Sequence, residues 1–295
     1  MASVSSGNKT ERFGFIDTHR TVLTVRYLCD WLGVSPAGYY KWRKRKPCER
    51  QYANKILSKK IERIYFKNDT NYGSPRVHQA LRNEGLRVNR KRVERIMRET
   101  GLVGKAGRIY RRKAVPDKFY TKMPNVKKDL GAPTAVDQQW VADLTYLKVA
   151  QKQLYLAVVM DLYSRRIIGW SLGENKTAEL TVSALQKALR YRTVSEGHIF
   201  HTDRGSEYGA YLMQNTLKRA GIKPSMNRPG TVTDNANMES FFQSMKTECI
   251  KGVSFKSESE LRVTLSWYLN KYYNQERLHS SIGYTSPIKY ERMAA

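Results

Sequence analysis

Three carboxylates in the second half of the chain stand in places where acidic side chains need an explanation. Asp143 lies inside the apolar strand pattern "WVADLTY", where a charge is costly unless it is paired or bound to a metal. Asp203 follows the apolar segment "HIFHT", and ligands of open sheets gather at such strand ends. Glu239 opens the helical pattern "NMESFFQSMKTE". Asp143 and Asp203 are 60 residues apart, and 35 residues lie between Asp203 and Glu239. Together they predict one catalytic site.

Each carboxylate also has a purely structural explanation. Asp143 can be a buried, satisfied Asp, Asp203 a turn or helix-cap residue, and Glu239 a first-turn Glu favoured by the helix dipole. At about 100° per residue, Glu239 falls on a polar stripe with Gln243 and Lys246. We therefore expect Glu239 and Lys246 to face a cleft. The neighbouring apolar stripe, expected to pack on the sheet, comprises Met238, Phe241, Phe242, Met245 and Cys249.

The elements that must position these carboxylates alternate between strands and helices from Trp140 onward. Three strand patterns come first, "QWVADLTYLKVA", "QLYLAVVMDLYS" and "RRIIGWSLG", and their short loops predict an antiparallel meander. A helix, a strand, a helix, a strand and two further helices follow. This order predicts an α/β fold with a mixed five-stranded sheet flanked by helices.

The charge of the chain is strongly positive and unevenly distributed. The formal net charge is +27, and residues 1–130 carry 32 Lys and Arg against 11 Asp and Glu. The remainder, with 21 against 15, is nearly balanced. Such a first half points to a polyanionic partner, either nucleic acid or an acidic membrane surface. The second half is then free to hold the catalytic domain.

Residues 22–46 have the outline of a helix-turn-helix unit. A first helix is expected to end near Trp31, Gly33 supplies a turn, and Ser35 caps a second helix that has Pro36 at its first position. Lys41 and Arg43 in its basic end are candidate DNA contacts. The alternative is two short helices that only pack on a neighbour.

A second pair of helices follows over residues 74–101. Asn89 is the expected cap of its second helix and Gly101 the expected end. One face of that helix carries candidate phosphate contacts, although a solvated charged face is the alternative: Arg90, Lys91, Arg92, Arg95 and Arg98. A basic, weakly patterned linker with "RIYRRK" comes next, and its Arg111 and Arg112 are predicted to lie along a nucleic-acid backbone.

Membrane and metal-thiolate classes are not indicated. No run of 18 or more apolar residues is present, and the first residues lack the apolar segment of a signal peptide. The cysteines Cys29, Cys48 and Cys249 are scattered without metal-ligand spacing. We expect reduced thiols, an intracellular protein, and no membrane partner.

Seven segments in order resemble the transposases of the insertion sequence three family, specifically their second reading-frame product. The resemblance covers roughly Thr24 to Tyr290 and is specific in its carboxylate spacing. Its carriers are "LGVSPAGYYKW", "YGSPRVHQALRNEGLRVNRKRVERIMRETGL", "QWVADLTYL", "YLAVVMDLYSRRIIGW", "HTDRGSEY", "DNANMESFFQSMKTE" and "YYNQERLHSSIGYTSP".

The resemblance implies an RNase H-like, retroviral-integrase-type catalytic core and a metal-dependent polynucleotidyl transferase. Asp143, Asp203 and Glu239 match the catalytic and metal-binding triad, and Lys246 matches a basic residue that contacts the transposon end. The expected cofactor is Mg²⁺, or alternatively Mn²⁺, as two ions. Asp143 is expected to bridge both ions. The implied partners are double-stranded DNA, further copies of the chain in at least a dimer on DNA, and the first reading-frame product. The implied location is the nucleoid of the bacterial cytoplasm.

Two alternatives differ in what they do to DNA or RNA. A non-catalytic DNA-binding repressor of transposition would bind without a metal and never nick DNA. A ribonuclease or junction nuclease would keep the fold but need no DNA-binding half.

The domain boundaries that we predict are a disordered N-terminus (1–20), a helix-turn-helix segment (21–47), a second helix-turn-helix domain (50–103), a basic linker (104–133), the RNase H-like core (134–285) and a C-terminal tail (286–295).

Overall fold

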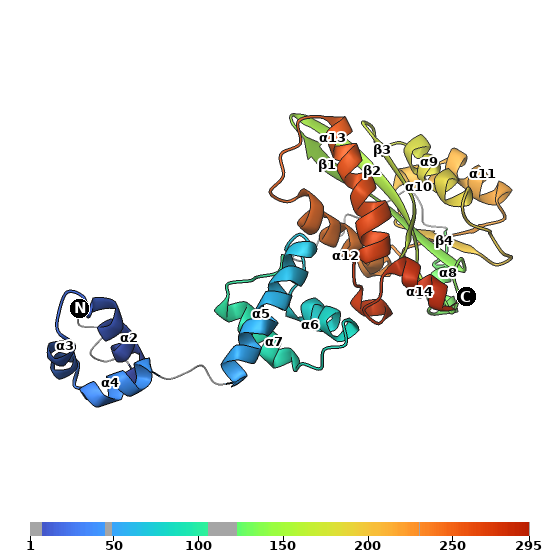
Figure 1. Ribbon diagram of the computed structural model, residues 1–295. Coiled ribbons are helices and arrows are strands. Elements are labelled where there is room, and N and C mark those ends of the chain that lie inside the picture. The colour runs from blue at the N-terminus through green and yellow to red at the C-terminus, as the bar shows by residue number, and fades with distance from the viewer. Residues whose placement is uncertain (1–7, 45–48, 106–122, 230, 295) are drawn as a thin grey trace. The chain divides into compact units, whose positions relative to one another are not determined.

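The computed structural model describes residues 8–44, 49–105, 123–229 and 231–294 (Figure 1). The chain divides into two compact units, residues 1–60 and residues 61–295. Each unit has buried apolar side chains of its own. The second unit contains both a helical domain and the sheet that carries the three predicted catalytic carboxylates.

The first unit contains three short helices, α2 (Lys9–His19), α3 (Val25–Leu32) and α4 (Pro36–Arg43). Gly33 ends α3 with a left-handed φ of 63°, and the Ser35 hydroxyl accepts a hydrogen bond from the Gly38 N–H at the start of α4. The helix, turn and helix predicted from the sequence are therefore present. Their shared core consists of Ile16, Leu28, Cys29, Leu32 and Tyr39.

The expectation of a disordered N-terminus over residues 1–20 is wrong for the part that the structure describes. Asn8 and Glu11 form a capping box that starts α2, and Ile16 is completely buried in the core of the first unit. The apolar residues of this helix are few, so its periodicity is weak in the sequence. Packing against α3 and α4 stabilises it instead.

A helical domain precedes the sheet. Helix α5 (Glu49–Lys67) contains the boundary between the units, and α6 (Ser74–Asn83) packs against α7 (Arg90–Glu99). The Asn89 side chain accepts a hydrogen bond from the Lys91 N–H, as expected of the cap of α7. Val77, Leu81, Val93, Ile96 and Met97 are buried between them, so the basic positions of α7 lie on its outer side.

The sheet has five strands in the order β3-β2-β1-β4-β5. Strands β1 (Gln139–Val149), β2 (Lys152–Asp161) and β3 (Ile167–Gly173) form the predicted antiparallel meander. Strands β4 (Ile199–Thr202) and β5 (Lys223–Met226) continue the sheet in parallel from β1. The mixed five-stranded sheet predicted from the order of elements is confirmed.

Helices cover both faces of the sheet (Figure 1). One core lies under α9 (Ala178–Leu189), α10 (Ser206–Gly209) and α11 (Tyr211–Arg219). The other lies under α12 (Ala236–Met245), η2 (Lys246–Ile250), α13 (Glu258–Ser266) and η3 (Trp267–Glu276). The apolar stripe predicted for α12 is buried there. Among the helices that the structure describes, none combines the length and the apolar character needed to cross a membrane.

Strand β3 and helix α9 approach each other at Gly169. A Cβ atom on Gly169 would stand 2.2 Å from the carbonyl oxygen of Ala184. Only glycine permits the two backbones to come this close. This contact fixes α9 on the face of the sheet opposite α12.

The ends of the domain that contains the sheet are more helical than the sequence predicts. The expected tail over residues 286–295 is instead helix α14 (Pro287–Ala294), whose Glu291 pairs with Arg166 and Arg192. The linker expected over residues 104–133 contains a short helix, α8 (Val126–Leu130). Short helical turns also occur at η1 (Val232–Asn235) and η4 (Ser280–Ile282). Arg111 and Arg112 lie outside the described residues.

Candidate active site

The register between β1 and β4 places two of the predicted catalytic residues side by side. Ala142 of β1 pairs with Thr202, the last residue of β4, and the next residue of each segment is an aspartate, Asp143 or Asp203. Neighbouring strands lie about 4.8 Å apart. Two residues that are 60 positions apart in the sequence are therefore adjacent at the end of the paired region.

Backbone N–H groups hold one oxygen of each aspartate. The Leu144 N–H donates to Asp143 Oδ1 at 2.7 Å, and the Gly205 N–H donates to Asp203 Oδ1 at 3.0 Å. Both side chains are half-buried. These bonds favour the charged carboxylates and fix their direction. The turn contact expected for Asp203 thus coexists with its place beside Asp143.

A buried tyrosine hydroxyl lies within electrostatic reach of both aspartates. Tyr208 is 2% exposed. Burial raises the pKa of its hydroxyl well above the usual value, and the charges of Asp143, Asp203 and Glu207 raise it further. Within the described part of the chain this hydroxyl has no hydrogen-bond partner. Oxygen atoms gathered in a half-buried place are the ligands that hard divalent cations take, so Asp143 and Asp203 fit such an ion.

Helix α12, which carries the third carboxylate, starts beside strand β1. The Asn235 Nδ2 group at its start donates to the Ala142 carbonyl oxygen at 3.1 Å, one residue before Asp143. Glu239 follows one helical turn later and is exposed. The three carboxylates do not form a closed cluster. Over residues 8–44, 49–105, 123–229 and 231–294, no group of three or more His, Cys, Asp and Glu side chains could hold a metal ion.

Lys246 lies at the other end of α12, at the first position of η2. Its Nζ atom stands 4.9 Å from the ring centroid of Tyr146, which is three residues beyond Asp143 on β1. A cation over an aromatic face is attracted by the ring. The ammonium group is thereby held beside the strand that carries Asp143, and its contact with DNA stays a prediction.

The helical projection missed the residue with the most partners near this site. Glu248 of η2 is buried, accepts two hydrogen bonds from Arg277 at 2.7 and 2.8 Å, and accepts a third from the Tyr268 hydroxyl at 2.8 Å. Arg76 of α6 approaches it at 3.4 Å. Burial alone would raise the pKa of this carboxyl, but the hydrogen bonds and charge of Arg277 and the charge of Arg76 lower it.

Glu248 connects the helical domain to the domain that contains the sheet. Besides the approach of Arg76, the Lys105 ammonium donates to the Glu248 carbonyl oxygen at 3.3 Å. Close by, the Tyr72 hydroxyl accepts from the Leu278 N–H at 2.9 Å. The only sequence signal was an acidic residue two positions after a basic one. Its partner Arg277 is 29 residues away, which no local pattern reveals.

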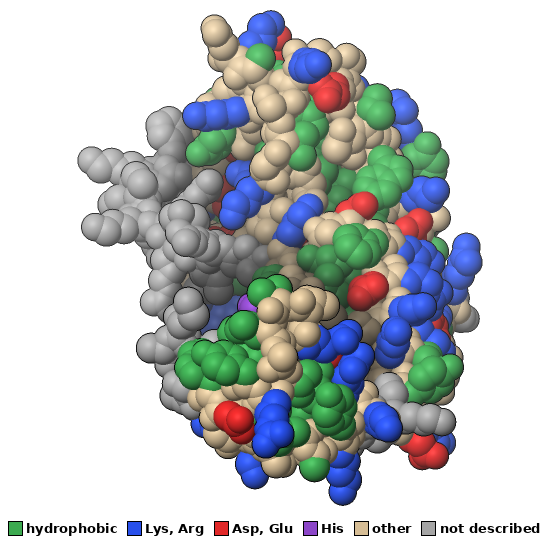
Figure 2. All heavy atoms as spheres, turned by 60° about the vertical axis from the view of Figure 1, so that its left-hand side comes forward, with side chains coloured by type: hydrophobic (Ala, Val, Ile, Leu, Met, Phe, Trp, Pro, Cys, Tyr) green, Lys and Arg blue, Asp and Glu red, His purple; other side chains and the backbone are tan. Residues whose placement is uncertain are grey.

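The candidate DNA contacts in the helical segments lie at the surface. Arg90, Lys91 and Arg98 are exposed on α7, while Arg95 pairs with Glu99 at 3.6 Å. Arg92 on the same helix is half-buried. In the first unit, Lys41 is exposed and Arg43 pairs with Asp17 at 3.3 Å. Lys and Arg side chains are spread over the face shown in Figure 2, among larger areas of hydrophobic and other side chains and with fewer acidic ones between them. Their role as DNA contacts stays a prediction.

Acid is expected to destabilise the fold through His201, a completely buried residue of β4. Its ring bonds Ser225 Oγ and Asn227 Oδ1, both at 2.9 Å. Burial, aided by the Lys127 charge, lowers its pKa to about 4. A depressed pKa gives stability that is present above pH 6.5 and lost as the pH falls toward 4. The expected loss is about 3 kcal/mol.

Urea unfolding at pH 7, 5.5 and 4.5 measures this dependence on pH. His201→Gln, which cannot take up a proton, should show a shallower loss than the wild type over the same range. His78→Gln, on helix α6, is the control and should parallel the wild type. An equal slope for His201→Gln and the wild type would contradict the assignment to His201.

Comparison with known proteins finds a matching family model in both halves of the chain. The family model described as "Integrase core domain" matches residues 133–232, a second model of the same description matches residues 220–287, and the model "HTH-like domain" matches residues 51–113. The "Transposase InsF for insertion sequence IS3A" of Escherichia coli is 36% identical over 95% of this chain and 98% of that protein. The "Insertion element IS600 uncharacterized 31 kDa protein" of Shigella sonnei is 36% identical over 91% of this chain and 100% of that protein. A solved chain of the simian T-cell lymphotropic virus intasome gives a TM-score of 0.46 at 14% identity, covering 78% of this chain and 74% of that one.

Proposed function

The chain belongs to the IS3-type insertion-sequence transposases, and from this premise we propose that it is a metal-dependent polynucleotidyl transferase that cleaves transposon ends and joins them to DNA. The observation that carries the proposal is the adjacency of Asp143, within β1, and Asp203, directly after β4, where the pairing of the two strands ends. Helix α12, tethered by Asn235 to the residue before Asp143, adds the third carboxylate.

The proposed ligands of the metal are Asp143, Asp203 and Glu239. Carboxylate oxygens suit Mg²⁺ and Mn²⁺ and do not suit softer ions. When bound, two such ions supply Lewis-acid activation of the attacking and leaving oxygens of a phosphodiester. Because Glu239 is exposed and outside any closed cluster, we infer that its side chain turns toward the two aspartates when metal and DNA bind.

The proposed reaction has two displacements at phosphorus. In the first, a water oxygen forms a bond to the phosphate at the transposon end, and the bond to the 3′-oxygen breaks to leave a free 3′-OH. In the second, that 3′-oxygen forms a bond to a phosphate of another strand, whose own 3′-oxygen leaves. No bond between protein and DNA is required. Lys246, held beside β1 by Tyr146, binds a phosphate of the end DNA and orients it.

The test is a strand-transfer assay on labelled end DNA. Joined products are expected with Mg²⁺ or Mn²⁺ and none with EDTA, while binding of the DNA persists in EDTA. A protein that binds end DNA under both conditions and never nicks it would instead be the repressor that the sequence left open. Light scattering of the same complex tests our proposal that at least two copies of the chain hold the two ends.

A further inference from the structure

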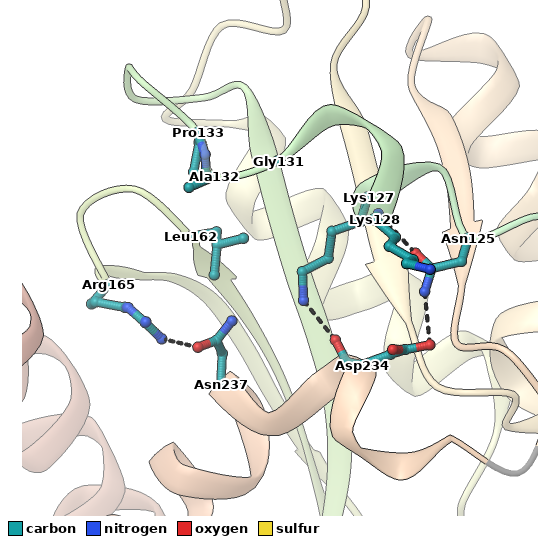
Figure 3. A pocket seen from close by; sticks show the side chains of 10 residues that line it. All are labelled: Asn125, Lys127, Lys128, Gly131, Ala132, Pro133, Leu162, Arg165, Asp234 and Asn237. Atoms are coloured by element: carbon teal, nitrogen blue, oxygen red, sulfur yellow. Dashed lines mark hydrogen bonds between the residues drawn. The ribbon is translucent and has the colours of Figure 1, made fainter.

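Two cavities lie along the edge of α12 that faces away from Glu239. The first has a volume of about 400 Å³ and is lined by residues that include Lys127, Asp234, Asn237 and Arg165 (Figure 3). The second, of about 180 Å³, shares Arg165 and Asn237 and adds Arg76. The two cavities meet at these shared residues and are together named the Arg165 groove below.

The Arg165 groove is separate from the catalytic edge of the same helix. At about 100° per residue, Asn237, Ser240 and Ser244 form one polar edge of α12, and Glu239 and Lys246 form the other. The apolar residues that pack on the sheet lie between the two edges. A ligand in the groove therefore occupies a different side of α12 from a phosphate at the three carboxylates.

Arg165 is a half-buried cation without an acidic partner. Its Nη1 donates to the Asn237 side-chain oxygen at 2.6 Å, and no carboxylate of the described residues lies within ion-pair distance. Its neighbours differ, because Arg166 pairs with Glu291 and Arg277 with Glu248. Burial lowers the pKa of Arg165, and the group that raises it is the Tyr273 hydroxyl rather than a carboxylate. Charges removed from water are normally paired, so the missing partner points to an anionic ligand.

The backbone at Arg165 adds an independent observation. Its φ is 65°, in the left-handed region that glycine or asparagine adopts easily and arginine does not. Residues held in this region gather at binding and catalytic sites, where the strain serves a purpose. The strained turn between β2 and β3 aims the guanidinium into the groove, toward Asn237 (Figure 3).

The rest of the groove supplies the donors that a phosphate needs. Lys127 reaches the first cavity from α8, on the opposite side of Leu162 from Arg165, and its ammonium donates to the Asp234 main-chain oxygen at 2.6 Å (Figure 3). The Asp234 carboxylate itself forms an ion pair with Arg228, with 3.1 Å between Arg228 Nη2 and Asp234 Oδ1. The lining of the second cavity contains no Asp or Glu among the described residues. It presents hydroxyl donors instead, from Ser240, Ser244, Ser280 and Ser281.

We propose that the Arg165 groove binds a phosphodiester of the DNA backbone, with the Arg165 guanidinium donating to its non-bridging oxygens. A planar guanidinium flanked by hydroxyl and amide donors matches phosphate oxygens, and such contacts position a duplex without reading its sequence. The choice of DNA as the source of the phosphate rests on the proposed function. The groove gives α12 a DNA contact on one side and the chemistry on the other.

The left-handed backbone at Arg165 allows a substitution that removes the side chain without straining the fold. Arg165→Gly removes the guanidinium but suits a φ of 65°, so it should unfold at a temperature no lower than the wild type. Its affinity for a fluorescein-labelled duplex of random sequence, measured by anisotropy in EDTA, should fall about tenfold. The slope of log Kd against log salt should become shallower by about one. Arg165→Lys keeps the charge and should keep the slope, with a smaller loss of affinity.

Controls separate this proposal from the catalytic one. Lys152→Gln removes an exposed cation paired with Glu174 and should leave affinity and slope unchanged. Because binding is measured in EDTA, the result does not depend on whether the protein joins DNA. Unchanged affinity and slope in both Arg165→Gly and Arg165→Lys would overturn the groove even if the wild type is an active transferase. A tenfold loss in Arg165→Gly supports the groove even if strand transfer is never seen.

Discussion

Asp143→Asn and Asp203→Asn are each expected to reduce strand transfer about a thousandfold or more while leaving duplex binding in EDTA unchanged. The amide keeps the size of the side chain and loses the negative charge that holds a divalent cation. Asp143 and Asp203 directly follow Ala142 and Thr202, which pair across β1 and β4. Either change therefore removes one of two adjacent proposed metal ligands. Single-turnover assays on labelled end DNA measure the loss.

The pattern across variants distinguishes a shared site from two independent effects. The double variant should be no less active than either single one, because ligands that act as a unit are not additive. Glu239→Gln should lose activity to a similar degree if α12 delivers its side chain to the aspartates. Glu174→Gln makes the same change of charge on an exposed residue and serves as the control. Normal strand transfer by Asp143→Asn would rule out the proposed triad.

Glu248→Gln is expected to lower the free energy of unfolding by about 3–5 kcal/mol. The variant keeps the shape of the side chain but leaves the Arg277 guanidinium, 4% exposed at its side chain, without a counter-charge. In the wild type, burial lowers the pKa of Arg277, and the hydrogen bonds and charge of Glu248 outweigh this and raise it. A guanidinium is not deprotonated in proteins, so the variant keeps a buried charge whose counter-charge is gone. Urea unfolding at pH 7 measures the cost.

Two further measurements define the origin of that cost. Glu248→Gln/Arg277→Met, which removes both charges, should be more stable than Glu248→Gln alone. Glu276→Gln, at an exposed neighbour, should leave stability unchanged.

The pKa of Glu248 is lower in the folded state than its usual value. Its contribution to the free energy of unfolding is therefore present above about pH 4.5 and is lost as the pH falls further. A Glu248→Gln protein as stable as the wild type would show that the pair contributes no net stability.

Much of the fold follows from patterns that are local in the sequence. Alternation and short loops predicted the meander of β1, β2 and β3, and the helical period predicted the buried stripe of α12. Single residues with fixed conformational preferences predicted the Gly33 turn and the Asn89 cap. These predictions succeed because each depends on neighbours within about one helical turn or one strand.

Helices at the two ends of the chain were missed for a physical reason. Helix α2 is weakly patterned and depends on the packing of Ile16 against α3 and α4. Helix α14 is held by Glu291, whose partners Arg166 and Arg192 come from the sheet domain. Short helices are marginal alone and form when tertiary contacts stabilise them, so a sequence window does not reveal them.

The sequence by itself determined which residues are unusual: a charge in the apolar strand at Asp143, a second carboxylate at the strand end, and Glu239 beside a helix stripe. Only the tertiary structure decided which of these meet. The parallel register makes Asp143 and Asp203 neighbours, the pairing of Glu248 with Arg277 ties η2 to the rest of the domain, and a strained turn gives Arg165 its direction. Strand register, ion pairs and backbone strain arise between residues that are far apart in the chain or from a single φ angle, and neither leaves a periodic trace in the sequence.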